Sequence, residues 1–184
     1  GIFGTQFFFE TLALNGLNDI AYNAMNQEDF PSFGNWIKQG ATVTWEKWNG
    51  ADSRNHPMFG GGLTWFYRIL AGVNVDAERP AYEHIIIKPI LDKRLPEVYY
   101  SHMTPYGEVV SEIRQTGRNL EMNVTVPVGS TATIYIPVGG NTSEVTESGI
   151  SVRDSKDVRF ERIQDGNCIV RVPQGKYKFK VDNQ

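Results

Sequence analysis

The sequence predicts a chain of two parts, a helical part over residues 1–78 and an antiparallel β-sandwich over residues 79–184. Two observations support this division. Apolar residues recur with a helical period before residues 78–80 and with period two after them. All four tryptophans fall between residues 36 and 65, so the second part contains none. The expected fold class is therefore multidomain α and β, with a boundary near residue 79.

The first two helices are expected to form a hairpin. Apolar residues between positions 5 and 14 recur at helical spacing, Thr5 is a suitable N-cap, and Asn15 and Gly16 end the helix. A second helix is expected from about residue 17 to residue 25. Because the link between them is so short, the two helices are expected to lie antiparallel.

Two further helices are expected before the change of period. Ser32 is a suitable cap for a short helix that reaches Gly40. A longer helix is expected to end at Gly72. Its core stripe repeats at i, i+3, i+4 and i+7 and consists of Leu63, Phe66, Tyr67 and Leu70.

The second part consists of short apolar runs separated by turn signals. The runs include EHIII, EVYYS, EVVSEIRQ, LEMNVTVP, TATIYIPV and CIVRVPQGKYKFKV. Turn residues stand at positions 105–107, 116–119, 128–130 and 139–141. Short strands at such regular spacing are typical of an antiparallel sandwich. His84 and His102 lie in this part and are expected on the surface of a sheet.

Composition excludes several functional classes. The formal net charge is -3 and there is no block of Lys or Arg, so no nucleic-acid partner is expected. No apolar run approaches the roughly 20 residues of a membrane-spanning helix, so no membrane partner is expected. The one cysteine, Cys168, excludes an internal disulfide and is expected to be a buried structural thiol. No cofactor is expected. The sequence leaves the cellular compartment open, and both the periplasm and the extracellular space remain candidates.

The segment GATVTWEKWNGADSRNHPMFGGG, residues 40–62, is the candidate functional loop. Two Trp side chains are costly to leave in water, so the loop is either buried under other residues or built to bind a ligand. The three glycines at its end lack the spacing and the Lys of a phosphate-binding loop. They are interpreted as a turn that allows close packing.

Glu46 is the candidate catalytic residue of this loop. In an extended segment Glu46 and Trp48 share one side, and Trp45 takes the other. A carboxylate beside an indole lies in a low-dielectric wall, which favours a general base near neutral pH. The indole faces of Trp45 and Trp48 are also suited to stack on sugar rings. The alternative is an ion pair of Glu46 with Lys47, Arg54 or Arg68, and tryptophans that belong to the core.

His56 is the second candidate, in a position where the following Pro57 disfavours helical geometry. Its ring is expected either to bind a substrate hydroxyl or to hydrogen-bond the backbone. A metal site is not expected, because His56, Asp52 and Glu46 have irregular spacing and too few further ligands.

Four segments together resemble one family: QEDFPSFGNWIKQGATVTWEKWNG, NHPMFGGGLTWFYRILAGV, AYEHIIIKPIL and YYSHMTPYGEVVSE. The chain strongly resembles the bacterial α-L-rhamnosidases of glycoside hydrolase family 78. The resemblance covers most of the chain and is densest between residues 27 and 112. The elements GAT-x-x-WE-x-W and NH-x-x-x-G are specific in combination.

The resemblance implies a fold and a chemistry. These enzymes have an (α/α)₆ catalytic barrel followed by a C-terminal β-sandwich, so the chain is expected to be a C-terminal fragment with the last barrel helices. They are inverting enzymes that use one acid and one base. The resemblance assigns the base to Glu46 and a rhamnose contact to His56. It places the general acid in an earlier part of the barrel, outside this chain. The expected partners are therefore rhamnose-containing glycosides and the remaining barrel helices of the same polypeptide.

Two alternatives remain open at the level of sequence. The chain is part of another (α/α)₆ glycosidase, or it is a carbohydrate-binding or structural unit with Tyr99, Tyr100 and Tyr106 as a platform. On the family interpretation the fragment alone is expected to be inactive. It is also expected either to self-associate through the unpartnered apolar residues Phe7, Phe8, Leu63 and Phe66 or to rearrange in its helical segment.

Overall fold

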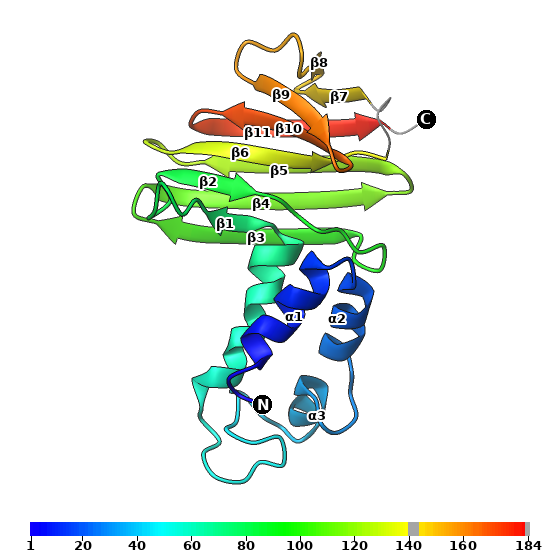
Figure 1. Ribbon diagram of the computed structural model, residues 1–184, viewed down its shortest axis with the longest axis vertical. Helices are drawn as coiled ribbons and strands as arrows, with labels where there is room; N and C mark the ends of the chain where they lie inside the picture. Colours follow the sequence, from blue (N-terminus) through cyan, green and yellow to red (C-terminus); the bar gives the residue numbers. More distant parts are fainter. Residues whose placement is uncertain (140–143, 183–184) are drawn as a thin grey trace. The chain divides into compact units, whose positions relative to one another are not determined.

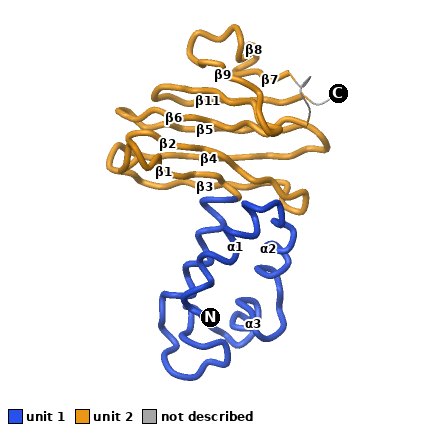
Figure 2. Tube along the Cα trace, viewed as in Figure 1, with its two compact units in different colours: residues 1–69 blue, residues 70–184 orange. Residues whose placement is uncertain are grey.

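The computed structural model describes residues 1–139 and 144–182 (Figure 1). These residues form two compact units, Gly1–Ile69 and Leu70–Gln184 (Figure 2). The turn predicted at residues 139–141 falls outside the described residues from position 140 onward. No helix among the described residues is both long enough and apolar enough to span a membrane.

The first unit begins with the predicted hairpin. Helix α1 spans Thr5–Leu14 and helix α2 spans Asn18–Met25, and the two run side by side in opposite directions (Figure 1). Gly16 follows α1 with a φ of 77°, a conformation that glycine adopts without strain. The predicted N-cap was wrong. Gly4 is the N-cap, and the Thr5 hydroxyl donates to the Gly1 carbonyl at 2.9 Å.

Helix α3 spans Phe33–Lys38 and confirms the predicted cap. The Ser32 hydroxyl accepts a hydrogen bond from the backbone N–H of Asn35 at 2.9 Å. Gly34 permits a close approach of this helix to the preceding segment, since a Cβ there would lie 2.4 Å from the Gln27 carbonyl oxygen.

The predicted helix after the glycine run has a different form. A 3₁₀-helix, η1, spans Pro57–Leu63, and a π-helix, η2, spans Trp65–Leu70. A 3₁₀ turn is tighter than an α-helical turn and a π turn is wider, so the regular stripe does not form. Leu63 and Phe66 are 48% and 45% exposed, whereas Trp65 is buried. The chain thus does not bury Leu63 and Phe66 in a core stripe, and their exposure agrees with the expectation that they lack their barrel neighbours.

The glycines within η1 allow close packing, as predicted. A Cβ on Gly61 would lie 2.8 Å from the Cβ of Gln6, and one on Gly62 would lie 3.1 Å from the Phe9 ring. The backbone of η1 at these two glycines therefore packs directly against side chains of α1.

The second unit consists of two sheets, as predicted for a sandwich (Figure 1). One has the order β1-β2-β6-β10-β9, formed by Val73–Val75, His84–Ile87, Thr131–Pro137, Asn167–Val172 and Arg159–Gln164. The other has the order β3-β4-β5-β11-β7-β8, formed by Glu97–Thr104, Gly107–Thr116, Asn119–Val126, Gly175–Asp182, Glu144–Glu147 and Ile150–Ser151. Described pairings are antiparallel except β2 with β6, which is parallel.

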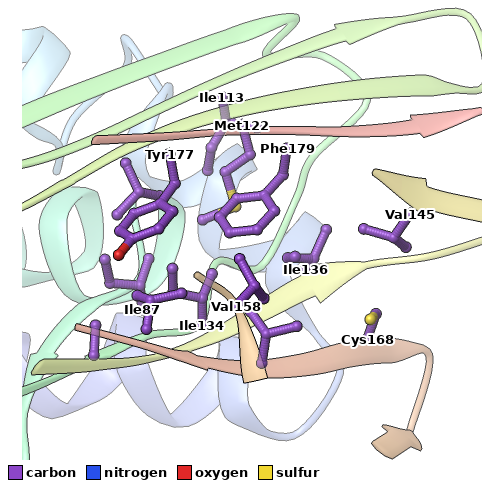
Figure 3. Packing of buried hydrophobic residues seen from close by; sticks show 14 of the residues in the cluster. Ile87, Ile113, Met122, Ile134, Ile136, Val145, Val158, Cys168, Tyr177 and Phe179 are labelled. Carbon is purple, nitrogen blue, oxygen red and sulfur yellow. The ribbon is translucent and has the colours of Figure 1, made fainter. Parts of the chain in front are cut away.

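Alternating side chains of the two sheets form the core of this unit. Strand β5 buries every second residue, from Leu120 to Val126. Figure 3 shows the two inner faces in contact, with Ile87, Ile134 and Ile136 from one sheet and Met122 and Phe179 from the other. The period of two in the sequence thus corresponds to one buried face and one more accessible face.

Strand β1 joins the sheet earlier in the chain than the change of period. Val73 pairs with Ile87 and Val75 with Ile85, so residues 73–75 belong to the second compact unit. Along the chain, the boundary between the two compact units thus falls between Ile69 and Leu70. The domain limits predicted from the sequence, 1–78 and 79–184, stay a prediction.

The two histidines of the second unit have different environments. His102 is exposed, as predicted. The prediction for His84 was wrong, because its ring is buried and bridges two hydroxyls of β6: Nδ1 lies 2.7 Å from Thr131 Oγ1, and Nε2 lies 2.8 Å from Thr133 Oγ1. Burial lowers the pKa of His84.

Cys168 lies in the core of the second unit (Figure 3). Burial raises the pKa of its thiol to about 11, so the thiol is protonated at neutral pH. This confirms the prediction of a buried structural cysteine.

Candidate active-site loop

The segment between α3 and η1 folds into two antiparallel arms that carry the candidate residues. The backbone N–H of Glu46 donates to the carbonyl of Ser53 at 2.8 Å, and that of His56 donates to the carbonyl of Thr44 at 2.8 Å. Residues 44–46 and 53–56 therefore face each other in a short ladder. Glu46 lies on one arm and His56 on the other.

A tight turn connects the two arms. The backbone N–H of Gly50 donates to the carbonyl of Lys47 at 3.0 Å, and the Lys47 ammonium pairs with the Asp52 carboxylate. Gly50 has a φ of 72°. Glycine is favoured in this left-handed region, which allows the chain to reverse within a few residues.

Both tryptophans beside Glu46 pack on the same aromatic cluster. The Trp36 ring centroid lies 5.6 Å from that of Trp45 and 4.5 Å from that of Trp48, and Trp48 lies 4.3 Å from Phe59. The Trp36 indole N–H donates to the Trp48 carbonyl at 2.8 Å. The predicted alternation was wrong, because the chain turns directly after Glu46 and brings Trp48 back to the side of Trp45.

This cluster gives the loop its rigid base. Trp45 is 4% exposed, and Trp48 is half-buried. The prediction that Trp45 contacts a sugar therefore concerns only the small exposed part of its ring. Trp48 retains more accessible surface for such a contact.

Glu46 is half-buried and held through one carboxylate oxygen. Its Oε2 accepts a hydrogen bond from the backbone N–H of Ser53 at 3.1 Å. Within residues 1–139 and 144–182, its Oε1 has no hydrogen-bond partner. The carboxylate is thus oriented by the backbone and keeps one oxygen for a further ligand.

The ion pairs proposed as the alternative role of Glu46 are not formed. Lys47 pairs with Asp52, and Arg68 pairs with Glu10. Arg54 donates from Nε to the carbonyl of Gly50 at 3.0 Å. Among the described residues no cationic group lies within the 4 Å ion-pair distance of Glu46.

His56 caps η1 with its side chain. Its Nδ1 accepts a long hydrogen bond, 3.5 Å, from the backbone N–H of Met58. In a neutral imidazole with an accepting Nδ1, the hydrogen is on Nε2. The half-buried ring thus presents Nε2 as a donor.

Three residues of the site make contacts that the sequence did not predict, and for Arg54 only an ion pair with Glu46 had been considered. Ser53 and Thr44 connect the arms, and Arg54 lies over the Trp45 ring with its Cζ 4.7 Å from the ring centroid. The Asn49-Gly50 dipeptide was the available signal, since it is typical of tight hairpin turns. It predicts the reversal, but not which side chains meet across it.

Two family models match consecutive parts of the chain, which together reach from residue 1 to residue 151. The model of the bacterial alpha-L-rhamnosidase 6 hairpin glycosidase domain matches residues 1–70. The model of the bacterial alpha-L-rhamnosidase C-terminal domain matches residues 72–151. The chain belongs to the bacterial α-L-rhamnosidase family. The match to the six-hairpin domain thus lies in the first compact unit, apart from residue 70, and the match to the C-terminal domain lies in the second.

Curated relatives and solved structures agree with this assignment. An alpha-L-rhamnosidase of Formosa agariphila is 28% identical over 98% of this chain and 20% of its own length. The structure of an alpha-L-rhamnosidase from Dictyoglumus thermophilum has a TM-score of 0.87 at 33% identity and covers 100% of this chain and 21% of that one. The structure of the Streptomyces avermitilis enzyme complexed with L-rhamnose has a TM-score of 0.86 at 25% identity and covers 99% and 18%.

Two curated rhamnosidases match 98% of this chain, and the chain spans about a fifth of the length of each. This agrees with the expectation that it is a portion of a longer rhamnosidase. The similarity extends over both compact units, since 98% of the chain is covered.

The three tyrosines proposed as a binding platform in the second unit lie in different environments. Tyr99 and Tyr100 are neighbours in β3 and therefore point to opposite faces of its sheet. Tyr99 is exposed, and Tyr100 packs against the core. Tyr106 lies in the turn before β4, against Gly129. The three side chains thus provide no common flat surface.

Proposed function

We propose that the protein is an inverting glycoside hydrolase that removes terminal α-L-rhamnose, and that this chain contributes the general base, Glu46. The observation that carries the proposal is the carboxylate of Glu46, which the backbone N–H of Ser53 orients through Oε2 and which no cation neutralises in the described part of the chain. An inverting glycosidase requires such a carboxylate to activate water.

The chemistry assigned to Glu46 is a single proton transfer. Oε1 takes a proton from a water molecule as the water oxygen bonds to the anomeric carbon. The bond from that carbon to the leaving oxygen breaks at the same time, and a carboxylic acid outside this chain protonates that oxygen. The two carboxyl groups are expected to lie roughly 6.5–9.5 Å apart, which leaves room for the water.

The remaining candidates are assigned to substrate binding. His56 presents Nε2 as a donor, which suits a hydroxyl of a bound sugar. Trp48 and the exposed part of Trp45 are assigned to the wall that limits access of bulk water. The Streptomyces avermitilis relative complexed with L-rhamnose supports rhamnose as the sugar.

We further propose that other helices of the same polypeptide cover the first unit. Large apolar side chains are exposed on α1, α2 and the segment of η1 and η2, namely Phe7, Phe8, Leu14, Ile20, Leu63 and Phe66. A patch of this kind is typical of an interface rather than of a solvated surface. The relatives have several times the length of this chain, which provides the helices required.

The test is hydrolysis of an aryl α-L-rhamnoside by the full-length protein, with wild type and Glu46→Gln compared. General-base assistance is worth about 10²–10⁴ in rate, so the variant is expected to lose at least about a hundredfold in kcat and to retain binding of rhamnose. A variant with wild-type kcat would contradict the assignment of the base. A wild type that prefers another aryl glycoside over the rhamnoside would contradict the proposed sugar.

A further inference from the structure

We propose that Arg54 is a positioning residue for Glu46, an inference that rests on the proposed function of the loop. The Arg54 side chain makes two contacts across the loop. Its guanidinium lies over the Trp45 ring with Cζ 4.7 Å from the centroid, and its Nε donates to the carbonyl of Gly50 at 3.0 Å. These contacts join the second arm to the first arm and to the turn.

The residues restrained in this way are direct neighbours of the base and of its hydrogen-bond donor. Trp45 immediately precedes Glu46 in the chain, and Ser53, whose N–H binds Oε2 of Glu46, immediately precedes Arg54. One side chain thus restrains both ends of the hydrogen bond that orients the carboxylate. Loss of Arg54 is expected to let the two arms shift relative to each other.

The packing around the guanidinium is close. A Cβ on Gly50 would lie 2.8 Å from Cζ3 of Trp45 and 3.2 Å from Nη2 of Arg54. The absence of a side chain at Gly50 therefore creates the space in which Arg54 and Trp45 meet. Arg54 is itself exposed, so it makes these contacts from the surface of the loop.

Two physical properties of arginine are needed here at once. The planar guanidinium stacks on an indole face, and its Nε–H donates in the same plane. A lysine keeps the charge, but its ammonium has no plane and no Nε–H at that position. A positioning role therefore predicts that Arg54→Lys and Arg54→Gln fail to the same extent, whereas a purely electrostatic role predicts that lysine suffices.

The expected kinetic effect is on kcat. A displacement of about 1 Å in a reacting group costs up to about 10²-fold in rate. Since Glu46 acts on the attacking water and not on sugar binding, kcat is expected to fall about 10- to 100-fold while KM changes less than about twofold.

The experiment measures kcat, KM and the melting temperature of the full-length protein with Arg54→Lys and Arg54→Gln. Arg153→Lys is the matched control, because Arg153 lies over Phe160 with Cζ 4.0 Å from the ring centroid, in the second compact unit. The expected result is low kcat in both Arg54 variants, with the KM, the melting temperature and the control unchanged. Wild-type kcat in Arg54→Lys, or a rise in KM alone, overturns the inference.

Glu46→Gln, assayed in parallel, separates the two proposals. An active Glu46→Gln variant refutes the proposed base and with it the reason for positioning. An inactive Glu46→Gln variant together with normal Arg54 variants refutes the positioning role alone.

Discussion

Thr44 and His56 are joined by a reciprocal pair of hydrogen bonds across the candidate loop. The Thr44 hydroxyl donates to the His56 carbonyl at 2.6 Å, and the backbone N–H of His56 donates to the Thr44 carbonyl at 2.8 Å. Because Glu46 follows Thr44 by two residues, this pair sets the position of the His56 arm relative to the base. The loop thus holds its two candidate polar groups on one small scaffold.

His56→Ala is expected to raise KM of the full-length protein for an aryl α-L-rhamnoside about tenfold and to change kcat less. One hydrogen bond between neutral groups is worth about 0.5–1.5 kcal/mol, and a contact made equally in the ground state and transition state affects KM. Steady-state kinetics measure both parameters. His102→Ala is the control, since His102 is exposed in the second unit. An unchanged KM for His56→Ala would assign the ring to the η1 cap alone.

The buried ring of His84 is expected to make the second unit sensitive to acid. Burial is the main reason for its lowered pKa, Arg79 and Arg171 lower the pKa further, and Asp76 raises it. The pKa of a histidine in an unfolded chain is about 6.5. Between that value and the lowered pKa, the unfolded chain binds a proton that the folded chain does not, so stability falls as the pH falls.

His84→Gln provides the measurement for this prediction. Glutamine retains hydrogen bonding to Thr131 and Thr133 but does not titrate. Urea denaturation followed by far-UV circular dichroism is expected to show a midpoint that drops below about pH 6.5 more steeply in wild type than in the variant. His102→Gln is expected to behave as wild type. Identical pH dependence of wild type and His84→Gln would refute the prediction.

The 184-residue chain is expected to self-associate in solution. Phe7, Phe8, Leu63 and Phe66 are 63%, 47%, 48% and 45% exposed. Large apolar side chains that are exposed in this way favour association. Light scattering of wild type and of Phe7→Ser/Phe66→Ser measures this, and the double variant is expected to be less associated. Val128→Ser is the control, as Val128 is exposed in the second unit. A monodisperse wild-type monomer would speak against the prediction.

Cys168 is expected to be inert towards thiol reagents in the folded protein. Its thiol is buried, and a pKa of about 11 leaves very little thiolate at neutral pH. Titration with a disulfide reagent is expected to show no fast reaction under native conditions and one reactive thiol per chain in denaturant. Fast native labelling would show that the core around β10 opens readily.

Local patterns in the chain were sufficient to predict the regular elements. The end of α1 at Asn15, the Ser32 cap and the strands β4, β5 and β6 were confirmed, because capping and hydrophobic periodicity act between residues close in sequence. The motifs around Glu46 and His56 were likewise sufficient to identify the family, which the matching family models confirm.

Contacts between distant residues determined what these patterns left open. Thr44 and His56 are 12 residues apart, and His84 is 47 and 49 residues from its two threonine partners. No local period reports such pairings, so the burial of His84 was mispredicted. The direction of Trp48 depends in the same way on a turn that long-range hydrogen bonds hold, and not on the alternation of a strand.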